Sequence, residues 1–133
     1  MKQTYVGGCH CGAVRYEATL DLSQGTIRCN CTICRKARAW LASVDTDDFR
    51  LLSAEEALGD YRFGPGNVHH RFCKTCGIKS FARVSRPDGT GFFVVVVSCL
   101  ENVADAELAA LPVMYLDGRN DNFSAPPLHT AHL

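Results

Sequence analysis

The chain has 133 residues with 14 basic and 14 acidic side chains, so its formal net charge is zero. This length is typical of one domain, and the apolar share of 47% is enough for a core that needs no disulfides. A neutral balance excludes the positive field that attracts nucleic acid or an anionic membrane, so we expect neither as a partner. We therefore expect small-molecule partners.

The sequence shows no feature of export or membrane insertion. No run approaches the roughly eighteen apolar residues of a membrane span. The opening "MKQTYVGGCH" lacks the apolar core of a signal peptide. We therefore expect a single cytoplasmic domain over residues 1–133, in which the eight cysteines stay reduced and favour metal binding over disulfides.

Alternation of apolar and polar residues predicts strands along most of the chain. In residues 14–19, Val14, Tyr16 and Ala18 alternate with polar neighbours, which is the pattern of a half-buried strand. Further strands are expected at 39–44, 49–53, 68–72, 79–84 and 92–99. The last of these is apolar on both faces, so we expect it to be a central strand.

Turns and short helices complete the predicted elements. "FGPGN" at 63–67 and "RPDGTG" at 86–91 contain turn-forming residues, and the second predicts a hairpin between its flanking strands. Short helices are expected at 53–58, after a serine cap, and at 105–111, before a proline. The tail, 124–133, is expected to be irregular. Together these features predict a mainly β fold with short helices.

Seven of the eight cysteines fall into three motifs. Cys9 and Cys11 form C-x-C in "GGCHCGAV", and Cys73 and Cys76 form C-x-x-C in "FCKTCG". Each pair precedes a glycine, which lets backbone amides turn toward the sulfurs of a zinc knuckle. A C-x-x-C can also be a redox dithiol, but that use is typical of a βαβ setting, which this sequence lacks. The two pairs therefore predict one closed, structural four-cysteine zinc site.

The third motif, "CNCTICRK", contains Cys29, Cys31 and Cys34. Three thiolates leave one tetrahedral position of a zinc ion for water or substrate, as in a catalytic site. A thiol that bound there would lose its proton and become a nucleophile. The alternative is a second closed site completed by a further ligand, which could be Cys99, His10, His69, His70 or a residue of another chain.

These three motifs, in this order and separation, resemble those of the glutathione-dependent formaldehyde-activating enzyme family, which shares its domain with centromere protein V. The segment "YLDGRNDNF" at 115–123 is similar to a motif near the end of many members, so the resemblance covers nearly the whole chain. It implies a β-rich fold of small sheets, like that of a zinc-binding chaperone and exchange factor of Rab GTPases.

The resemblance also implies a chemistry for each motif. It implies that the two pairs, Cys9 with Cys11 and Cys73 with Cys76, hold a structural zinc. It implies that the triplet, Cys29, Cys31 and Cys34, holds a catalytic zinc. The family reaction adds glutathione to formaldehyde and gives S-hydroxymethylglutathione, which is carbon–sulfur lyase chemistry in reverse. The implied partners are therefore a glutathione-like thiol and an aldehyde.

Two classes of function are consistent with the motifs. The leading hypothesis is a zinc-dependent carbon–sulfur lyase-type enzyme that forms or cleaves a thiol–aldehyde adduct. The alternative is a non-catalytic zinc module that binds a protein partner. Redox or iron–sulfur use of the triplet is weaker, because it gives no role to the other cysteines. A free fourth position at the triplet favours the enzyme, and four protein ligands favour the module.

Residues beside the motifs permit two interpretations each. Arg35, Lys36 and Arg38 follow the triplet and either act on the thiols or a substrate carboxylate, or form a solvated basic turn. His69 and His70 are neighbours on a predicted strand, so their side chains point to opposite faces and at most one faces a given site.

The sequence also predicts the surroundings of Trp40, of Cys99 and of the segment "DGRNDNF". Trp40 is expected in the core rather than in a pocket wall. Cys99 ends the most apolar strand and is expected to be a buried, unligated thiol. In "DGRNDNF", the polar residues either line a pocket or make turns at Asp117 and Asn120.

Overall fold

The computed structural model describes all 133 residues and is mainly β, as the sequence predicts. A three-stranded sheet has the order β1-β2-β5, and a seven-stranded sheet has the order β10-β3-β4-β9-β8-β7-β6. The strands are β1 Gln3–Gly8, β2 Arg15–Leu20, β3 Thr26–Cys29, β4 Leu41–Asp45, β5 Phe49–Leu51, β6 Leu58–Tyr61, β7 Val68–Cys73, β8 Lys79–Ser85, β9 Gly91–Val96 and β10 Val113–Leu116. The α-helices are α1 Thr32–Ala37 and α2 Asp105–Ala109, and neither is long and apolar enough to cross a membrane.

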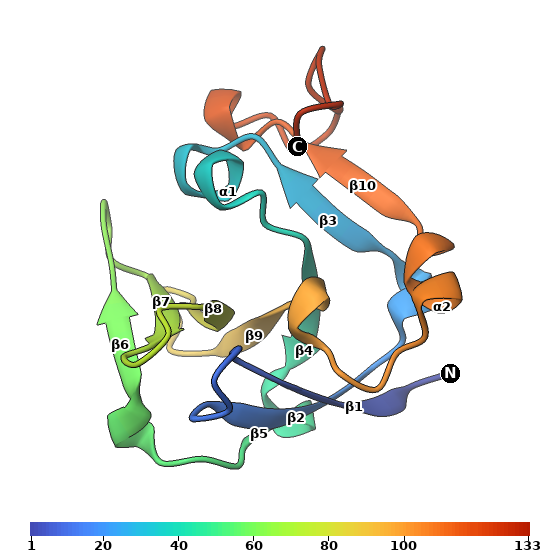
Figure 1. Cartoon of the computed structure of the whole chain (residues 1–133). Coiled ribbons are helices and arrows are strands. Elements are labelled where there is room, and N and C mark those ends of the chain that lie inside the picture. The colour runs from blue at the N-terminus through green and yellow to red at the C-terminus, as the bar shows by residue number, and fades with distance from the viewer.

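The seven-stranded sheet curves, so that β10 and β6 lie on opposite sides of the molecule while β1, β2 and β5 lie below it (Figure 1). Every pairing is antiparallel except that of β10 with β3. Because β3 and β10 run in the same direction, the loops that follow them leave the sheet at the same end. The short loop after β3 leads into α1, and the cysteine triplet spans this connection from Cys29 to Cys34.

The core lies between the two sheets and is organised around Tyr16 of β2. The side chain is fully buried, and its hydroxyl donates a hydrogen bond to the backbone oxygen of Ser80 at 2.9 Å. Its ring packs against Phe49 at 5.1 Å and Phe81 at 5.5 Å between centroids. Gly7 of the adjacent β1 is required here, because a Cβ at that position would lie 2.6 Å from the Tyr16 ring.

All six predicted strands are present, as β2, β4, β5, β7, β8 and β9. The segment predicted at 92–99 is β9, the fourth of the seven strands and therefore central, although it ends at Val96 and continues as a single 3₁₀ turn. The predicted hairpin at 86–91 joins β8 to β9, which pair as far as Ser85 and Gly91. The helix predicted at 105–111 is α2. The tail, 124–133, has no helix or strand, although Leu133 at its end is buried.

The helix predicted at 53–58 is wrong. Residues Glu55–Ala57 form only a single 3₁₀ turn, capped by Ala54. The hydroxyl of Ser53, which was expected to cap a helix, instead accepts the N–H of Arg15 at 3.0 Å beside the β2–β5 pairing. The Ser53 hydroxyl therefore accepts a backbone N–H of β2 instead of the N–H groups at the start of a helix.

Candidate metal centres and substrate pocket

The first candidate centre contains the two cysteine pairs. Cys9 and Cys11 lie between β1 and β2, Cys73 ends β7, and Cys76 lies in the turn before β8. Their four Sγ atoms lie within 4.8 Å of one another. The Sγ atom of Cys11 lies 3.7 Å from the Sγ of Cys9 and 3.6 Å from the Sγ of Cys73. Tetrahedral zinc with Zn–S bonds of about 2.3 Å needs sulfurs about 3.8 Å apart, so this group fits the ion.

Two glycines shape the turns of this centre. Gly12 has φ +87° and Gly77 has φ +80°, so each turn passes through the left-handed region directly after a cysteine. Backbone amides then point at sulfur: the N–H groups of Thr75 and Cys76 lie 3.3 and 3.4 Å from Cys73 Sγ. These bonds, led by that of Cys76, lower the pKa of Cys73 and favour the thiolate that a metal requires.

The second candidate centre contains the triplet. Cys29 ends β3, Cys31 caps α1 and Cys34 lies in the first turn of α1. The three Sγ atoms lie within 4.8 Å of one another, and no histidine, aspartate or glutamate joins them. Three thiols without a fourth protein ligand are the donor set of an open zinc site.

None of the side chains that could have closed this site joins the cluster of three sulfurs, and His10 is exposed. His69 Nδ1 lies 3.1 Å from Asp60 Oδ2. His70 lies on the other face of β7, where it is buried. Cys99 is only half-buried rather than buried, and lies close enough to Cys9 and Cys76 for their charges to raise its pKa, after the larger effect of burial. All eight cysteines are free thiols.

Within the triplet, the pKa values of Cys31 and Cys34 depend on each other. A hydrogen bond with the Cys34 thiol lowers the pKa of Cys31 to about 5, and the same bond raises the pKa of Cys34. Burial raises the pKa of Cys29, although the N–H of Cys31 points at its sulfur at 3.4 Å. The lowered pKa of Cys31 favours the thiolate form that a metal ion binds.

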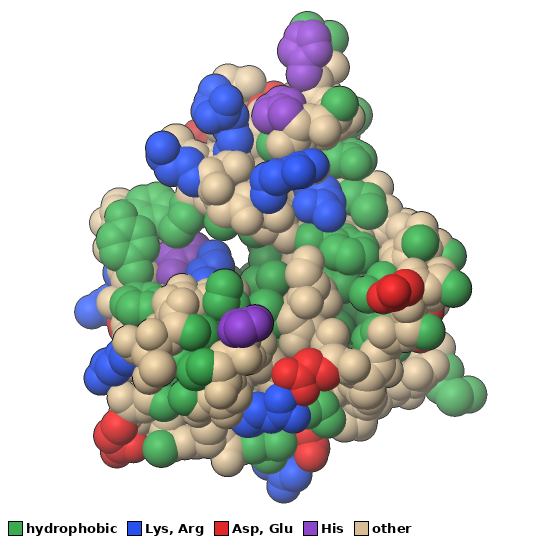
Figure 2. Space-filling view, in the orientation of Figure 1, with side chains coloured by type: hydrophobic (Ala, Val, Ile, Leu, Met, Phe, Trp, Pro, Cys, Tyr) green, Lys and Arg blue, Asp and Glu red, His purple; other side chains and the backbone are tan.

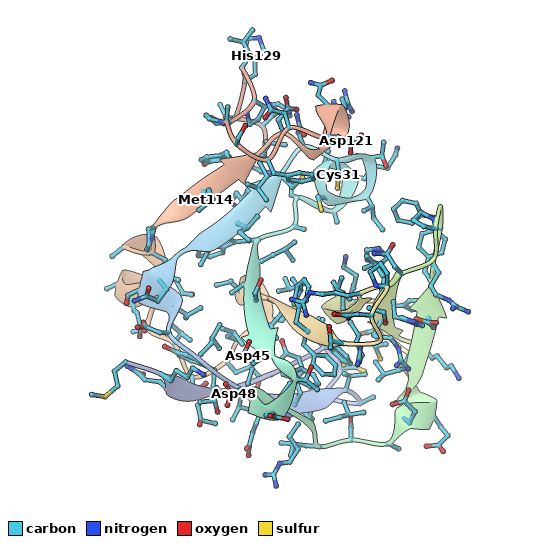
Figure 3. All side chains as sticks on the ribbon, turned by 180° about the vertical axis from the view of Figure 1, so that it is seen from behind. Cys31, Asp45, Asp48, Met114, Asp121 and His129 are labelled. Carbon is cyan, nitrogen blue, oxygen red and sulfur yellow. The ribbon has the colours of Figure 1, made fainter.

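The loop after β10 covers the triplet. Leu116 pairs with Cys29, which places the next residue, Asp117, beside Asn30. The buried Asp117 carboxylate accepts hydrogen bonds from Asn120 Nδ2 at 3.1 and 3.0 Å and from Asn30 Nδ2 at 2.8 Å. These donors lower the pKa of Asp117. The segment 115–123 thus makes turns rather than a pocket wall. Figure 3 shows its Asp121 near Cys31, at one end of the molecule.

Gly118 allows this loop to approach the triplet closely. A Cβ at this position would lie 2.5 Å from Cys29 Sγ and 3.3 Å from the Cβ of Cys31. No real side chain tolerates the first distance, so only glycine fits here without moving the sulfur.

A pocket of about 220 Å³ lies beside Cys31 and Cys34. Its apolar walls come from α1, the β6–β7 loop and strands β7 to β9, and include Ile33, Phe63, Val68, Val84, Val94 and Val96. The only lining groups with polar nitrogen are His70 and Lys79. Figure 2 shows a hollow at this place, below α1, bordered by hydrophobic, basic and histidine side chains.

Lys79 is the cation that faces the triplet. Its Nζ lies 3.0 Å from His70 Nδ1. Burial, followed by the charge of Lys79, lowers the pKa of His70 to about 4, so the imidazole is neutral and accepts this hydrogen bond. Burial also lowers the pKa of Lys79, whereas the charges of Cys34 and Cys31 raise it.

The basic residues after the triplet, Arg35, Lys36 and Arg38, are exposed on or directly after α1, and Lys36 lines a depression of the surface there. They form the solvated basic turn that the sequence left open as one alternative. Trp40 packs against the core, as expected, and its Nε1–H donates to Thr26 Oγ1 at 2.7 Å.

A β-bulge turns Lys79 into the pocket. His70 pairs with Ala82, but Phe72 pairs with Lys79, because the register between β7 and β8 shifts at this point. The shift leaves Ser80 as the extra residue of β8, so Lys79 shares a face with Phe72, His70 and Ala82. A regular strand would have placed Ser80 on that face instead.

The comparison with known proteins agrees with this arrangement. The sequence pattern of the family described as glutathione-dependent formaldehyde-activating enzyme matches residues 4–116. The chain belongs to this family. The match to the formaldehyde-activating family includes all seven clustered cysteines and the strand β10 that positions the covering loop.

A solved structure of similar shape supports the fold. The crystal structure of a Rhodobacter sphaeroides protein, a structural genomics target, is 34% identical in sequence and has a TM-score of 0.68. The similarity covers 82% of this chain and 99% of that chain.

Proposed function

We propose that this chain is a zinc-dependent enzyme of the carbon–sulfur lyase type, which forms or cleaves an adduct between a thiol and an aldehyde at Cys29, Cys31 and Cys34. One observation carries the proposal: the triplet has three thiols, no further protein ligand, and two of its members in a pocket wall. The family supports the substrates, because its named activity uses glutathione and formaldehyde. In this proposal the four-cysteine group holds a second, structural zinc.

The proposed reaction balances without an oxidant or a reductant. In the synthetic direction the thiol sulfur bonds to the aldehyde carbon, the C=O double bond becomes a single bond, and the thiol proton ends on the oxygen. The lyase direction reverses each change. A zinc ion held by the triplet would supply the Lewis acid that keeps an incoming thiol deprotonated near neutral pH.

The chain's own residues position the aldehyde. Lys79 Nζ uses one proton on His70 and has two left to donate to a carbonyl oxygen. Negative charge develops on that oxygen when the sulfur attacks, and a preorganised cation stabilises it most in a site that excludes water. The apolar walls of the pocket provide that exclusion. His70 holds Lys79 in place without competing for the charge, because its imidazole is neutral.

The test compares one cysteine from each centre. In the purified protein we expect Cys31→Ser to remain folded, to lose one zinc equivalent and to lose turnover of glutathione with formaldehyde. Cys73→Ser should lose folding stability together with metal, because metal binding at a structural site contributes folding free energy. Cys99→Ser is the control and should keep both metals and turnover. Zinc content, thermal unfolding and adduct formation measured by ¹³C NMR distinguish these outcomes.

Equal loss of structure in Cys31→Ser and Cys73→Ser would contradict the proposal and favour the non-catalytic zinc module. The same conclusion would follow if the protein held two zinc ions and produced adduct only at the uncatalysed rate. We place this activity in the cytoplasm, because eight free thiols are kept reduced there.

A further inference from the structure

The pocket beside the triplet has a chemistry that formaldehyde does not need. Formaldehyde has no substituent to bury, and glutathione is charged at both ends. The pocket wall nevertheless presents valine side chains from three adjacent strands, Val68 of β7, Val84 of β8, and Val94 and Val96 of β9. No acidic or hydroxyl side chain lines it.

We infer that the aldehyde used by this chain carries an apolar substituent, aliphatic or aromatic and about the size of a benzene ring, which this pocket binds. The inference rests on the proposed function and names its substrate class. The reaction becomes R–SH + R′–CHO → R–S–CH(OH)–R′ with R′ apolar. The S–C bond forms, the thiol proton ends on the carbonyl oxygen, and no other reactant is consumed.

The size of the pocket sets the size of the substituent. A buried apolar cavity of about 150 Å³ is known to hold benzene. The pocket here measures about 220 Å³, which leaves room for a ring of that size and the adjoining carbonyl carbon. Each Å² of apolar surface removed from water contributes about 25 cal/mol, so filling the pocket favours such a substrate over formaldehyde. A carboxylate or sugar-like substituent would lose its hydration among these walls without a partner.

The polar groups of the pocket favour the aldehyde over the thiol as its occupant. A carbonyl oxygen needs a hydrogen-bond donor, and Lys79 presents one between the apolar walls and the triplet. The polar body of a thiol such as glutathione has a separate place. A shallow depression lined by Thr32, Lys36 and Tyr61 adjoins the pocket, because Ile33 and Phe63 line both.

The first experiment measures turnover with aldehydes that differ in the substituent. With glutathione as the thiol, we expect kcat/KM for benzaldehyde to exceed that for formaldehyde and for glyoxylate, a carboxylate-bearing aldehyde, by at least about tenfold each. Val84→Phe fills the pocket and should lower both ratios, benzaldehyde to formaldehyde and benzaldehyde to glyoxylate, to about one. Val113→Phe on β10 is the matched control: this valine is also half-buried but lies outside the pocket, so neither ratio should change.

Three results would overturn the inference. Glyoxylate or formaldehyde could be preferred over benzaldehyde. Val84→Phe could lower all aldehydes alike, which would indicate general damage to the centre. Phenylmethanethiol with formaldehyde could gain the tenfold advantage that benzaldehyde lacks, which would assign the pocket to the thiol.

The second experiment measures binding without turnover, so that failure of the inference and failure of the proposed function are separable. Benzyl alcohol has the same ring and cannot form the adduct. We expect it to shift the methyl NMR resonances of Val84, Val94 and Val96 and to leave those of Val113 in place. Turnover of formaldehyde with no such shift would overturn the inference alone. The expected shift with no turnover of any aldehyde would overturn the proposed function and, with it, the aldehyde as the ligand.

Discussion

The Asp117 carboxylate accepts a hydrogen bond from Asn30 Nδ2 at 2.8 Å, and this bond joins the loop after β10 to the loop that carries the triplet. Asn120 of the same covering loop donates to both carboxylate oxygens. Asn30 in turn accepts the N–H of Arg119 at 3.0 Å, so the two loops bind each other in both directions. This arrangement fixes Asn30, which lies between Cys29 and Cys31.

We therefore expect Asp117→Asn to weaken the triplet as a metal site. An amide at this position presents its own N–H₂ to the donors of Asn30 and Asn120, so at least one buried hydrogen bond is lost. The free energy of unfolding should fall by about 1–3 kcal/mol. Affinity for one zinc equivalent should fall about 10- to 100-fold, as for other residues that orient metal ligands. Denaturant unfolding and competition with a chelator measure the two effects.

Asp121→Asn is the control for this variant. Asp121 lies in the same loop, is exposed, and has a left-handed backbone that asparagine tolerates. Its substitution should change neither quantity. If both variants bind zinc as tightly as the original protein does, the Asp117 network does not position the triplet.

Gly118→Ala tests the close approach of the covering loop to the triplet. The new Cβ would lie 2.5 Å from Cys29 Sγ, so either the sulfur or the loop must move. We expect the variant to lose the zinc equivalent of the triplet while it keeps that of the four-cysteine group. Arg119→Ala, an exposed neighbour, should retain both. Zinc content after dialysis measures this loss. Two retained equivalents in Gly118→Ala would show that the loop moves away without disturbing the triplet.

The two cysteine clusters could be predicted from the sequence because the spacing within each motif is local. The two cysteines of a C-x-x-C motif can reach one ion independently of the rest of the fold. The positive φ of Gly12 and Gly77 agrees with the tight turn that is expected after each cysteine pair. The partner of each pair was inferable by counting, since Cys9 and Cys11 needed two more thiols. The strand pattern of β2, β8 and β9 was equally local.

The pocket residues could not be predicted in this way. Alternation along "KSFARV" groups Lys79 with Phe81 and Arg83, and only the bulge at Ser80 moves it to the face of His70. Strands β1, β3, β6 and β10 were missed. Three of these, β3, β6 and β10, have only four residues each, and β3 and β10 pair with each other across a long separation in the sequence. One feature could have drawn attention to Lys79: a lysine that opens an apolar strand three residues after a metal ligand.

Lys79→Met should separate stability from function. The pKa of Lys79 is lowered overall, which means that the folded protein disfavours its charge, so a neutral side chain of similar length should raise the free energy of unfolding. Turnover should fall by about 100-fold, because the developing oxyanion loses its donor. Lys74→Met, at an exposed lysine in the turn before β8, should alter neither. Loss of both stability and turnover in Lys79→Met would indicate a structural role instead.

The last prediction concerns acid. Burial lowers the pKa of His70 to about 4 in the folded protein, whereas an unfolded histidine titrates near 6.5. Between these values the unfolded chain binds a proton that folded His70 does not, so stability increases with pH across this window and falls on acidification from about 6.5 to 4. This one group contributes at most about 1.4 kcal/mol per pH unit, and below pH 4 its contribution no longer changes.

His70→Gln should therefore show a shallower loss of stability from pH 6.5 to 4 than the original protein, while His69→Gln, beside Asp60 on the other face of β7, keeps the original slope. Both variants keep all seven clustered cysteines, so acid release of any bound zinc affects them alike and cancels in the comparison. Denaturant midpoints at several pH values give the slopes. An NMR titration of the His70 ring gives the pKa directly, and a midpoint near 6.5 would mean that the imidazole is not held neutral beside Lys79.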